Sequence, residues 1–391
     1  MNPAPPGSFA EVLGVFLRLG LTSFGGPVAH LGYYRREIVE RRGWLDEAAF
    51  ADIVALCQFL PGPASSQTAI SIGILRAGMP GGFAAWIGFT MPSAVAMAAF
   101  AYAVAWLGDL SGAGWLHGLK IVAVAVVANA VWGMARSLCP DAQRATVAVA
   151  AAILVLLAPG AWGQVGAIVA GAAIGWAGLR DGAPPRHSPL TISLPRGWPT
   201  AAGVLFPVLL FGLPIAAAAV PALDLRLFDS FYRSGALVFG GGHVVLPLLQ
   251  AEVVPPGWVS NDLFLAGYGA AQAVPGPLFT FSAYLGTVIG GWPRGLLCLV
   301  AIYLPSFLLL IAALPYWDRV RRLPAVQSAL RGINAAVVGI LLAALYRPVW
   351  LSAILGPRDF AIGIAAFLLL AMWKVPPWLV VVLGAVAAAF G

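Results

Sequence analysis

The chain is 391 residues long, 61% of them hydrophobic and only 9% charged, and its mean hydropathy is +0.90. A soluble domain carries roughly 25% charged residues, so this composition excludes a soluble globular protein and predicts a polytopic membrane protein. The net charge of +7 needs no nucleic-acid partner, because the basic excess of a membrane protein normally lies in cytoplasmic loops. The sequence has no CxxC, HExxH or GxxxxGK[ST] motif, so we expect no metal site, no cofactor and no ATP-driven transport.

The first two apolar regions of the chain are interrupted. Residues 8–42 are broken at Phe24-Gly-Gly-Pro27, and residues 46–78 are broken at Pro61-Gly-Pro63. Lipid offers no partner to the backbone groups that a broken helix leaves free, so protein or a water-filled cavity must satisfy them. We expect two re-entrant helical hairpins, each of which returns to its starting side.

Continuous apolar segments follow, and most have the 17–25 residues that a helical crossing needs. They are residues 81–107, 115–138, 143–159, 161–179, 199–221, 295–316, 325–346, 359–373 and 375–390. Between the fifth and the sixth of them, residues 226–251 and 260–290 are again interrupted by glycine and proline. The pattern predicts an all-α membrane protein in which pairs of hairpins precede groups of crossings.

The second half of the chain repeats the first. Residues 16–26 align with residues 231–241, and six of the eleven positions are identical. Equivalent positions, here called repeat mates, continue in order with only two one-residue gaps. They include Glu37 and Glu252, Gln58 and Gln272, Pro61-Gly62-Pro63 and Pro275-Gly276-Pro277, Gly78 and Gly291, and Pro92-Ser93 and Pro305-Ser306. The chain therefore reads as a duplicated protein, with repeats at 1–180 and 199–391 and a linker at 181–198.

The basic residues indicate that the two repeats are inverted. The segment 33–47 contains four arginines, whereas its equivalent, 251–262, contains no Lys or Arg. The positive-inside rule places the first segment in the cytoplasm and the second outside. We expect two inverted-topology repeats, each with two re-entrant hairpins and about four transmembrane helices, a pattern typical of secondary transporters. A rival count treats some hairpin arms as full crossings and gives ten to thirteen spans.

Several motifs occur in a fixed order along the chain. They are Ser23-Phe-Gly-Gly-Pro-Val-Ala-His30, Arg41-Arg-Gly-Trp-Leu45, Leu56-Cys-Gln-Phe-Leu-Pro-Gly-Pro63, Ile72-Gly-Ile-Leu-Arg-Ala-Gly78, Phe89-Thr-Met-Pro-Ser93, Phe239-Gly-Gly-Gly-His243 and Ala273-Val-Pro-Gly-Pro277. Together they resemble the chromate ion transporter (CHR) family in its long two-domain form, over nearly the whole chain. The resemblance implies chromate export across the cytoplasmic (inner) membrane, conferring resistance and driven by the proton motive force.

Two other functions remain open beside the one that the resemblance implies. A transporter of another tetrahedral oxyanion such as sulfate is the alternative, and sulfate should in any case compete with chromate. A membrane enzyme acting on a lipid phosphate would need a catalytic acid/base or metal cluster, and the four histidines have no acidic cluster beside them, so we expect no enzyme. Besides the transported anion, we expect membrane lipid and protons as the partners of the protein. The sequence does not determine the oligomeric state, and a homodimer is one of the open alternatives.

Candidate anion donors surround the four breaks. A tetrahedral anion must exchange its water for other donors, and a helix N-terminus offers unpartnered N–H groups and the positive end of a dipole. The tip residues are Phe24, Gly25, Gly26, Pro27, Pro61, Gly62, Pro63, Gly240, Gly241, Gly242, Pro275, Gly276 and Pro277. The side-chain donors nearby are Ser65, Ser66, Gln67 and Thr280, and Gln58 and Gln272 precede the tips. The alternative is that Gly and Pro merely form tight turns while Ser and Thr cap helices.

Basic residues inside apolar segments form a second candidate set. Arg18 and Arg233 are repeat mates, and an arginine within a membrane is energetically unfavourable. They either form cationic steps for a dianion or make structural ion pairs with Glu37 and Glu252. Lys120 either attracts substrate or extends toward the outer interface.

Titratable residues near the tips are candidates for proton coupling. His30 and His243 follow the glycine-rich tips, and a histidine changes charge near neutral pH. Glu37, Asp52 and Glu252 are the other proton-carrier candidates. A purely structural role is the alternative for each histidine.

Overall fold

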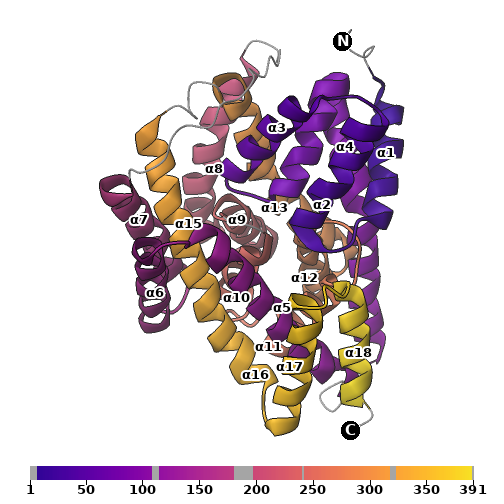
Figure 1. Ribbon diagram of the computed structural model, residues 1–391, viewed down its shortest axis with the longest axis vertical. Helices are drawn as coiled ribbons and strands as arrows, with labels where there is room; N and C mark the ends of the chain where they lie inside the picture. Colours follow the sequence, from indigo (N-terminus) through magenta and orange to yellow (C-terminus); the bar gives the residue numbers. More distant parts are fainter. Residues whose placement is uncertain (1–6, 108–113, 180–196, 240–241, 318–322, 390–391) are drawn as a thin grey trace.

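The computed structural model describes residues 7–107, 114–179, 197–239, 242–317 and 323–389. These residues form helices joined by short loops, and no strand occurs among them (Figure 1). Within this part of the chain, five helical segments are long and apolar enough to cross a membrane: Ala64–Leu107, Gly114–Leu138, Trp198–Ala219, Trp292–Tyr316 and Pro324–Ala353. The expected all-α polytopic membrane fold is confirmed, whereas the inversion of the repeats stays a prediction.

The first interrupted region folds as two short helices joined at the glycines. Helix α1 (Phe9–Thr22) begins at Ser8, whose hydroxyl accepts a hydrogen bond from the N–H of Glu11, as an N-cap should. Helix α2 (Gly26–Tyr34) follows the turn and continues as the π-helical turn η1 (Arg35–Arg41).

The second interrupted region breaks at its Pro-Gly-Pro and bends again further on. Helix α3 (Glu47–Phe59) precedes the Pro-Gly-Pro tip, and α4 (Ala64–Leu107) starts directly after it. α4 is kinked at Gly78, whose φ is +64°. Its repeat mate Gly291 has a φ of +81° and separates α12 from α13. Glycine adopts such positive φ values without steric penalty, so both repeats bend at the same position for the same reason.

The continuous apolar segments of the first half form helices close to the expected bounds. They are α5 (Gly114–Leu138), α6 (Ala142–Leu157) and α7 (Ala161–Gly178), and α8 (Trp198–Ala219) follows the linker. In the most apolar stretch of α8 only 6% of the residues are buried by protein. We infer that α8, which has no repeat mate in the first half, faces lipid along most of its length.

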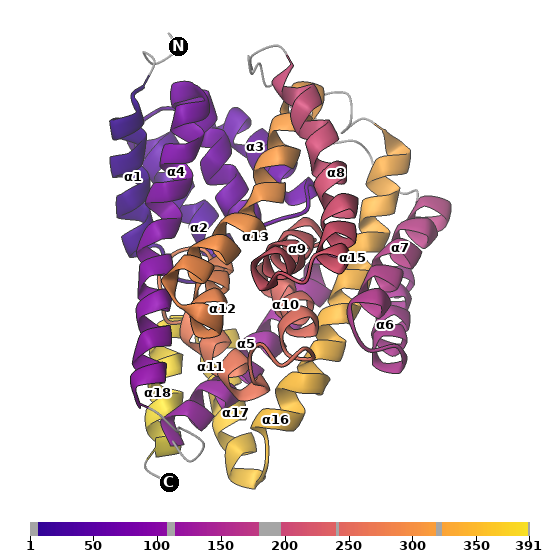
Figure 2. The same cartoon turned by 180° about the vertical axis from the view of Figure 1, so that it is seen from behind.

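The second half follows the same plan in more pieces. In chain order these are α9 (Leu223–Ala236), η2 (Gly242–Val244), α10 (Val245–Val253), α11 (Asn261–Ala271), η3 (Leu278–Thr280), α12 (Phe281–Gly290), α13 (Trp292–Ala313), η4 (Leu314–Tyr316), α15 (Pro324–Ala344), η5 (Leu345–Trp350), α16 (Leu351–Ala353), α17 (Pro357–Ala371) and α18 (Pro377–Ala389). Figure 2 shows α9 to α13 from the side on which they are most visible.

Glycine contacts hold the first hairpin of each repeat to a long helix. In the first half, Gly20 of α1 lies against the backbone of Gly88 and Phe89 in α4, with no room for a side chain. In the second half, Gly235 of α9 lies in the same way against Ile302 of α13. Gly20 and Gly235 are repeat mates, and so are Phe89 and Ile302. Close approach through small residues is the usual way for helices to associate in a membrane.

The helices that follow the hairpins in each half pack on helices of the other half. α5 of the first half packs on α17 and α18 of the second, and α15 of the second half packs on α6 and α7 of the first (Figure 1). Gly118 of α5 meets Gly384 of α18, whereas Gly332 of α15 meets Gly171 and Gly175 of α7. Gly118 and Gly332 are repeat mates. Each half therefore completes its packing with helices of the other.

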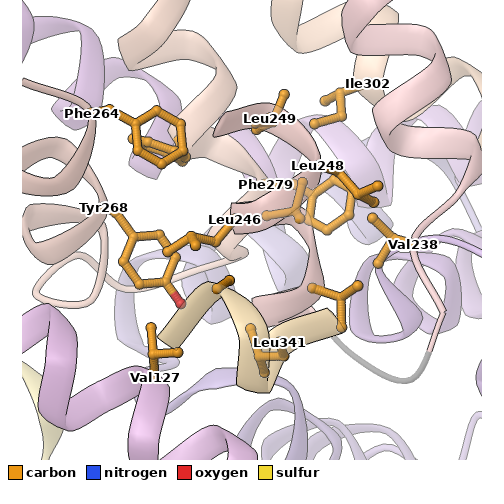
Figure 3. Packing of buried hydrophobic residues seen from close by; sticks show 14 of the residues in the cluster. Val127, Val238, Leu246, Leu248, Leu249, Phe264, Tyr268, Phe279, Ile302 and Leu341 are labelled. Atoms are coloured by element: carbon orange, nitrogen blue, oxygen red, sulfur yellow. The ribbon is translucent and has the colours of Figure 1, made fainter. Parts of the chain in front are cut away.

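The buried side chains form two main cores. One lies among α1 to α4 and includes Phe16, Tyr34 and Phe89. The larger one lies mainly in the second half, where Val238, Leu249 and Phe279 are among its members (Figure 3). Residues at the hairpin tips belong to these cores, Leu60 to the first and Val238 and Phe279 to the second, so the packing of the cores also holds the tips.

Candidate functional site

The four hairpin tips meet one another at the junction of the two halves. The N–H of Gly62 donates to the backbone oxygen of Val238 at 2.6 Å, and the N–H of Gly276 donates to the backbone oxygen of Ser23 at 2.9 Å. Gly62 and Gly276 are repeat mates, and so are Ser23 and Val238. Each Pro-Gly-Pro tip therefore binds the glycine-rich tip of the other repeat.

Further contacts at this junction also join each Pro-Gly-Pro tip to a residue of the other repeat. A Cβ atom added to Gly62 would lie 2.5 Å from the hydroxyl oxygen of Ser306, and one added to Gly276 would lie 2.8 Å from that of Ser93. Ser93 and Ser306 are again repeat mates. The φ values of Gly62 and Gly276 are +126° and +100°, which L side chains rarely adopt. Both tips thus need glycine for conformation and for space.

The other tip residues lie around this junction. Gly25 and Gly26 have φ values of +101° and +78°, and Pro27 opens α2. A Cβ atom added to Gly242 would lie 3.7 Å from Pro27, so the two glycine-rich tips also face each other. The ring of Phe24 turns instead toward Trp378 of α18, with ring centroids 6.3 Å apart. Gly240 and Gly241 lie outside the described residues.

Buried hydroxyl groups gather beside the first Pro-Gly-Pro tip. We define the hydroxyl cluster as Tyr34, Ser66, Thr90, Tyr303 and Ser306. The hydroxyls of Ser66 and Thr90 lie next to that of Tyr303, and the hydroxyl of Tyr34 is close enough to interact with it. Tyr303 and Ser306 come from α13 of the second half and the others come from the first. The cluster is therefore built by both repeats.

The hydroxyl cluster is buried, and its hydroxyls make no hydrogen bond of standard geometry to protein. Each of its five side chains is at most 1% exposed, and none of its hydroxyl oxygens has a partner of standard hydrogen-bond geometry among the described residues, although Ser66 and Thr90 interact with Tyr303 inside the cluster. A buried polar group without a partner destabilises a protein by about 1–3 kcal/mol. Such groups are rare in native structures and call for an explanation. A polar ligand at this position would supply one.

Glutamine and serine side chains extend the polar region along the start of α4. The Nε2 of Gln67 donates to the backbone oxygen of Pro61 at 2.8 Å, while its Oε1 is buried without a partner among the described residues. Ser65 Oγ lies 3.3 Å from the Nδ1 atom of His30. Thr280, which follows the second Pro-Gly-Pro, instead donates its hydroxyl to the backbone oxygen of Pro277 at 2.9 Å.

The two candidate histidines have different neighbours. His30 is 1% exposed, and its ring lies between Ser65 and the backbone of Ser23 at the first tip. His243 is only partly buried, and its Nδ1 lies 2.8 Å from the hydroxyl of Tyr268. Which atom donates depends on the tautomer in each case. His30 is the histidine that touches the tip junction.

The paired arginines differ more than their equivalence in sequence suggests. Arg233 forms an ion pair with Glu252 at 2.8 Å and another with Asp229 at 2.9 Å, beside a pocket of about 270 Å³ that these three side chains line. Arg18 is exposed on α1, and no described carboxylate pairs with it. The ion-pair interpretation therefore holds for Arg233 and not for Arg18.

Glu37 pairs with residues other than the expected Arg18. The turn η1 brings Arg42 to 2.7 Å and Arg41 to 3.0 Å from its carboxylate, because residues four and five positions apart lie on one face of a π-helical turn. Burial alone would raise the pKa of Glu37, but the hydrogen bonds and charges of Arg42 and Arg41 outweigh it and lower this pKa. Glu37 thus belongs to the arginine-rich loop outside the apolar segments.

Four further candidates are Lys120, Gln58, Gln272 and Asp52, and none of them belongs to the hydroxyl cluster. Lys120 forms an ion pair with Asp262 at 3.0 Å, which fixes α5 to the first turn of α11. Gln58 is exposed on α3, so it does not join the buried tip, whereas Gln272 is partly buried. Asp52 is fully buried on α3. Among the described residues, no three His, Cys, Asp or Glu side chains are grouped so that they could hold a metal ion.

Sequence reasoning missed four members of the hydroxyl cluster, of which Tyr34 is one. Thr90 and Tyr303 are repeat mates, and each precedes a Pro-Ser pair by two residues. Ser306 belongs to the second of these pairs. Polar residues that recur at one position of two otherwise apolar helices are the signal that could have identified them.

The comparison with known proteins fits this duplicated arrangement. The family described as chromate transporter matches the chain twice, over residues 10–176 and 225–389. The chain belongs to the chromate transporter family. Each matched stretch lies within one of the two predicted repeats, and membership supports a multi-pass transporter rather than an enzyme.

Several members of the family resemble the chain along most of its length. A chromate transport protein of Pseudomonas aeruginosa is 28% identical over 86% of this chain and 80% of its own. A probable chromate transport protein of Synechococcus elongatus is 26% identical over 98% and 95%. A chromate transport protein of Cupriavidus metallidurans is 26% identical over 88% and 84%. No solved structure matches the chain.

Proposed function

We propose that the protein is a secondary transporter that exports chromate across the cytoplasmic membrane, coupled to the proton motive force. The observation that carries this proposal is the reciprocal contact of the four hairpin tips. It is supported by the names of the relatives in Pseudomonas and Cupriavidus, which are chromate transport proteins. Discontinuous helices that meet between two repeats are typical of binding sites in secondary transporters.

The anion would bind where the tips meet. α4 starts directly after Pro63, and the first N–H groups of a helix lack partners within the helix and favour negative charge. The hydroxyl cluster adds side-chain donors that make no hydrogen bond of standard geometry to protein. A dianion that sheds its water in the membrane needs such donors, and this junction offers them in a buried place.

Proton coupling would involve His30. Its ring contacts Ser65 at the start of α4 and lies near the backbone of Ser23, which accepts the hydrogen bond from Gly276. Gain or loss of a proton on this ring would therefore act on the tip contact between the halves. Glu252 and Asp229 face Arg233 in a separate pocket. They are the second group of residues that could carry protons.

Another tetrahedral oxyanion, sulfate above all, is the second candidate substrate. The donors at the junction are hydroxyls and backbone amides, which recognise charge and shape. Chromate and sulfate are both tetrahedral dianions, so the arrangement supports either substrate, and we expect sulfate to compete with chromate.

The proposal is tested by transport into everted membrane vesicles. Energised vesicles that contain the protein should accumulate chromate, and an uncoupler should stop the accumulation. Parallel measurement with radioactive sulfate distinguishes the two candidate substrates. A lack of energised uptake of chromate into correctly oriented vesicles that hold folded protein would refute chromate export.

A further inference from the structure

Several polar residues of the first half at the tip junction have apolar repeat mates in the second half. Tyr34 and Gln67 of the first half have Leu249 and Phe281 as their repeat mates, and Ser23 has Val238. The three second-half residues belong to the larger hydrophobic core, and Figure 3 shows Val238 and Leu249 among its labelled members. At these three positions the second half therefore has apolar side chains where the first half has polar ones.

The repeat mates Ser66 and Thr280, which are polar in both halves, also differ in their hydrogen bonds. Ser66 and Thr280 each stand three residues after the last proline of a Pro-Gly-Pro tip. The hydroxyl of Thr280 is used locally, because it donates to the backbone oxygen of Pro277, while that of Ser66 makes no hydrogen bond of standard geometry among the described residues and lies beside the hydroxyl of Tyr303. The second tip also continues as the short 3₁₀ turn η3, whereas α4 begins as a regular helix.

We propose that the protein binds its oxyanion at a single place, on the first-half side of the tip junction, through uncharged donors. The donors are the hydroxyls of Ser66, Thr90, Tyr303 and Ser306 together with the N-terminus of α4. This inference rests on the proposed function, which supplies the tetrahedral oxyanion. Since Tyr303 and Ser306 belong to the second half, the second repeat completes the site without carrying one of its own.

Cationic side chains do not take part in this site. Among the described residues, no lysine or arginine is as much as nine-tenths buried and could accompany a buried anion. Arg233 already faces two carboxylates. Hydroxyl and amide dipoles can stabilise a dehydrated dianion, and because they bring no opposite charge, the anion can leave again. Weak, multiple contacts of this kind suit a transporter, which must release what it binds.

Single substitutions that each remove one donor test the inference. Ser66→Ala, Tyr303→Phe and Ser306→Ala should each raise the half-saturating chromate concentration for uptake into everted vesicles by about tenfold or more, which corresponds to 1.4 kcal/mol. Ser282→Ala is the matched control, because Ser282 is equally buried but donates its hydroxyl to the backbone oxygen of Phe279. It should leave that concentration within about twofold of the wild type.

Thr280→Val distinguishes one site from two. A single site in the first half predicts that this variant binds chromate as the wild type does. Equal losses in Ser66→Ala and Thr280→Val would contradict the inference, as would unchanged affinity in all three donor variants that are shown to be folded.

A binding measurement separates this inference from the proposed function. Chromate, sulfate and molybdate are titrated at constant ionic strength, and the thermal stability of the purified full chain is followed. If wild-type vesicles take up no chromate but an oxyanion stabilises the wild type and not Tyr303→Phe, the site stands and chromate export fails. If no tetrahedral oxyanion stabilises the wild type, the site itself is refuted.

Discussion

At the scale of single residues, equivalent positions in the two repeats have acquired different roles. Arg18 and Arg233 are repeat mates, yet Arg18 is exposed while Arg233 bridges Asp229 and Glu252. The mate of Asp229 is Gly14, so the first half has no second carboxylate to hold an arginine. The equivalence of Arg18 and Arg233 in the sequence therefore predicts the helix on which each arginine lies, but not the residues with which it pairs.

Substitution of the two arginines should separate these roles. Arg233→Ala would leave Asp229 and Glu252 buried and unpaired, so we expect a loss of about 3 kcal/mol in unfolding free energy. Arg18→Ala, the matched control at an exposed position, should change it by about 0.5 kcal/mol or less. Thermal unfolding of the detergent-purified variants measures both. An Arg233→Ala variant as stable as the wild type would show that the ion pairs do not hold α9 to α10.

The ion pairs of Glu37 should make the stability of the folded protein depend on pH. Its pKa is lowered in the folded protein by Arg42 and Arg41, so its ion pairs contribute stability above the ordinary pKa of 4.5. That contribution is lost as the pH falls through the lowered value. Glu37→Gln should therefore be less stable than the wild type at neutral pH, and the difference should shrink below pH 4.5. Unfolding curves across this range that keep a constant difference would contradict the assignment.

At the scale of helices, the sequence predicted the ends of elements well and their partners poorly. Apolar length and glycine-proline breaks are local properties, so the bounds of α5 to α8 and the four breaks lie where expected. The exchange of α5 and α15 between the halves depends on the small residues of distant segments, such as Gly118 and Gly384. Local patterns cannot reveal such contacts. The same holds for Tyr303, which reaches the first tip from the second half.

The crossing of α15 and α7 provides a test at this scale. Gly332 of α15 lies against the backbone of Gly171 and Gly175, with no space for a side chain. Gly332→Val should force these helices apart and lower the yield of folded protein in the membrane, because close backbone approach holds them together. Gly166→Val on α7 is the matched control, since a Cβ atom there would have no neighbour within 4 Å.

Size-exclusion chromatography in detergent compares the two glycine variants. Size-exclusion profiles in detergent should show a sharp peak for Gly166→Val and a reduced or aggregated one for Gly332→Val. Equal profiles for the two variants would mean that the crossing of α15 and α7 does not depend on small residues.

At the scale of the whole molecule, the tip junction depends on contacts between the two repeats, so separation of the repeats would break it. Each Pro-Gly-Pro tip is hydrogen-bonded to the other repeat, and α5 and α15 each pack on helices of the opposite half. The hydroxyl cluster lies at this seam and draws side chains from both halves. A relative movement of the repeats would therefore change the site directly, as alternating access requires.

The central claim is that a tetrahedral oxyanion binds on the first-half side of the tip junction. An electron cryo-microscopy map of the full chain with tungstate, an electron-dense tetrahedral dianion, tests this most directly when compared with a map in chloride alone. We expect one additional density peak within hydrogen-bond distance of Ser66, Tyr303 and Ser306. A peak beside Arg233, a second peak at Thr280, or no difference between the maps at saturating tungstate would contradict it.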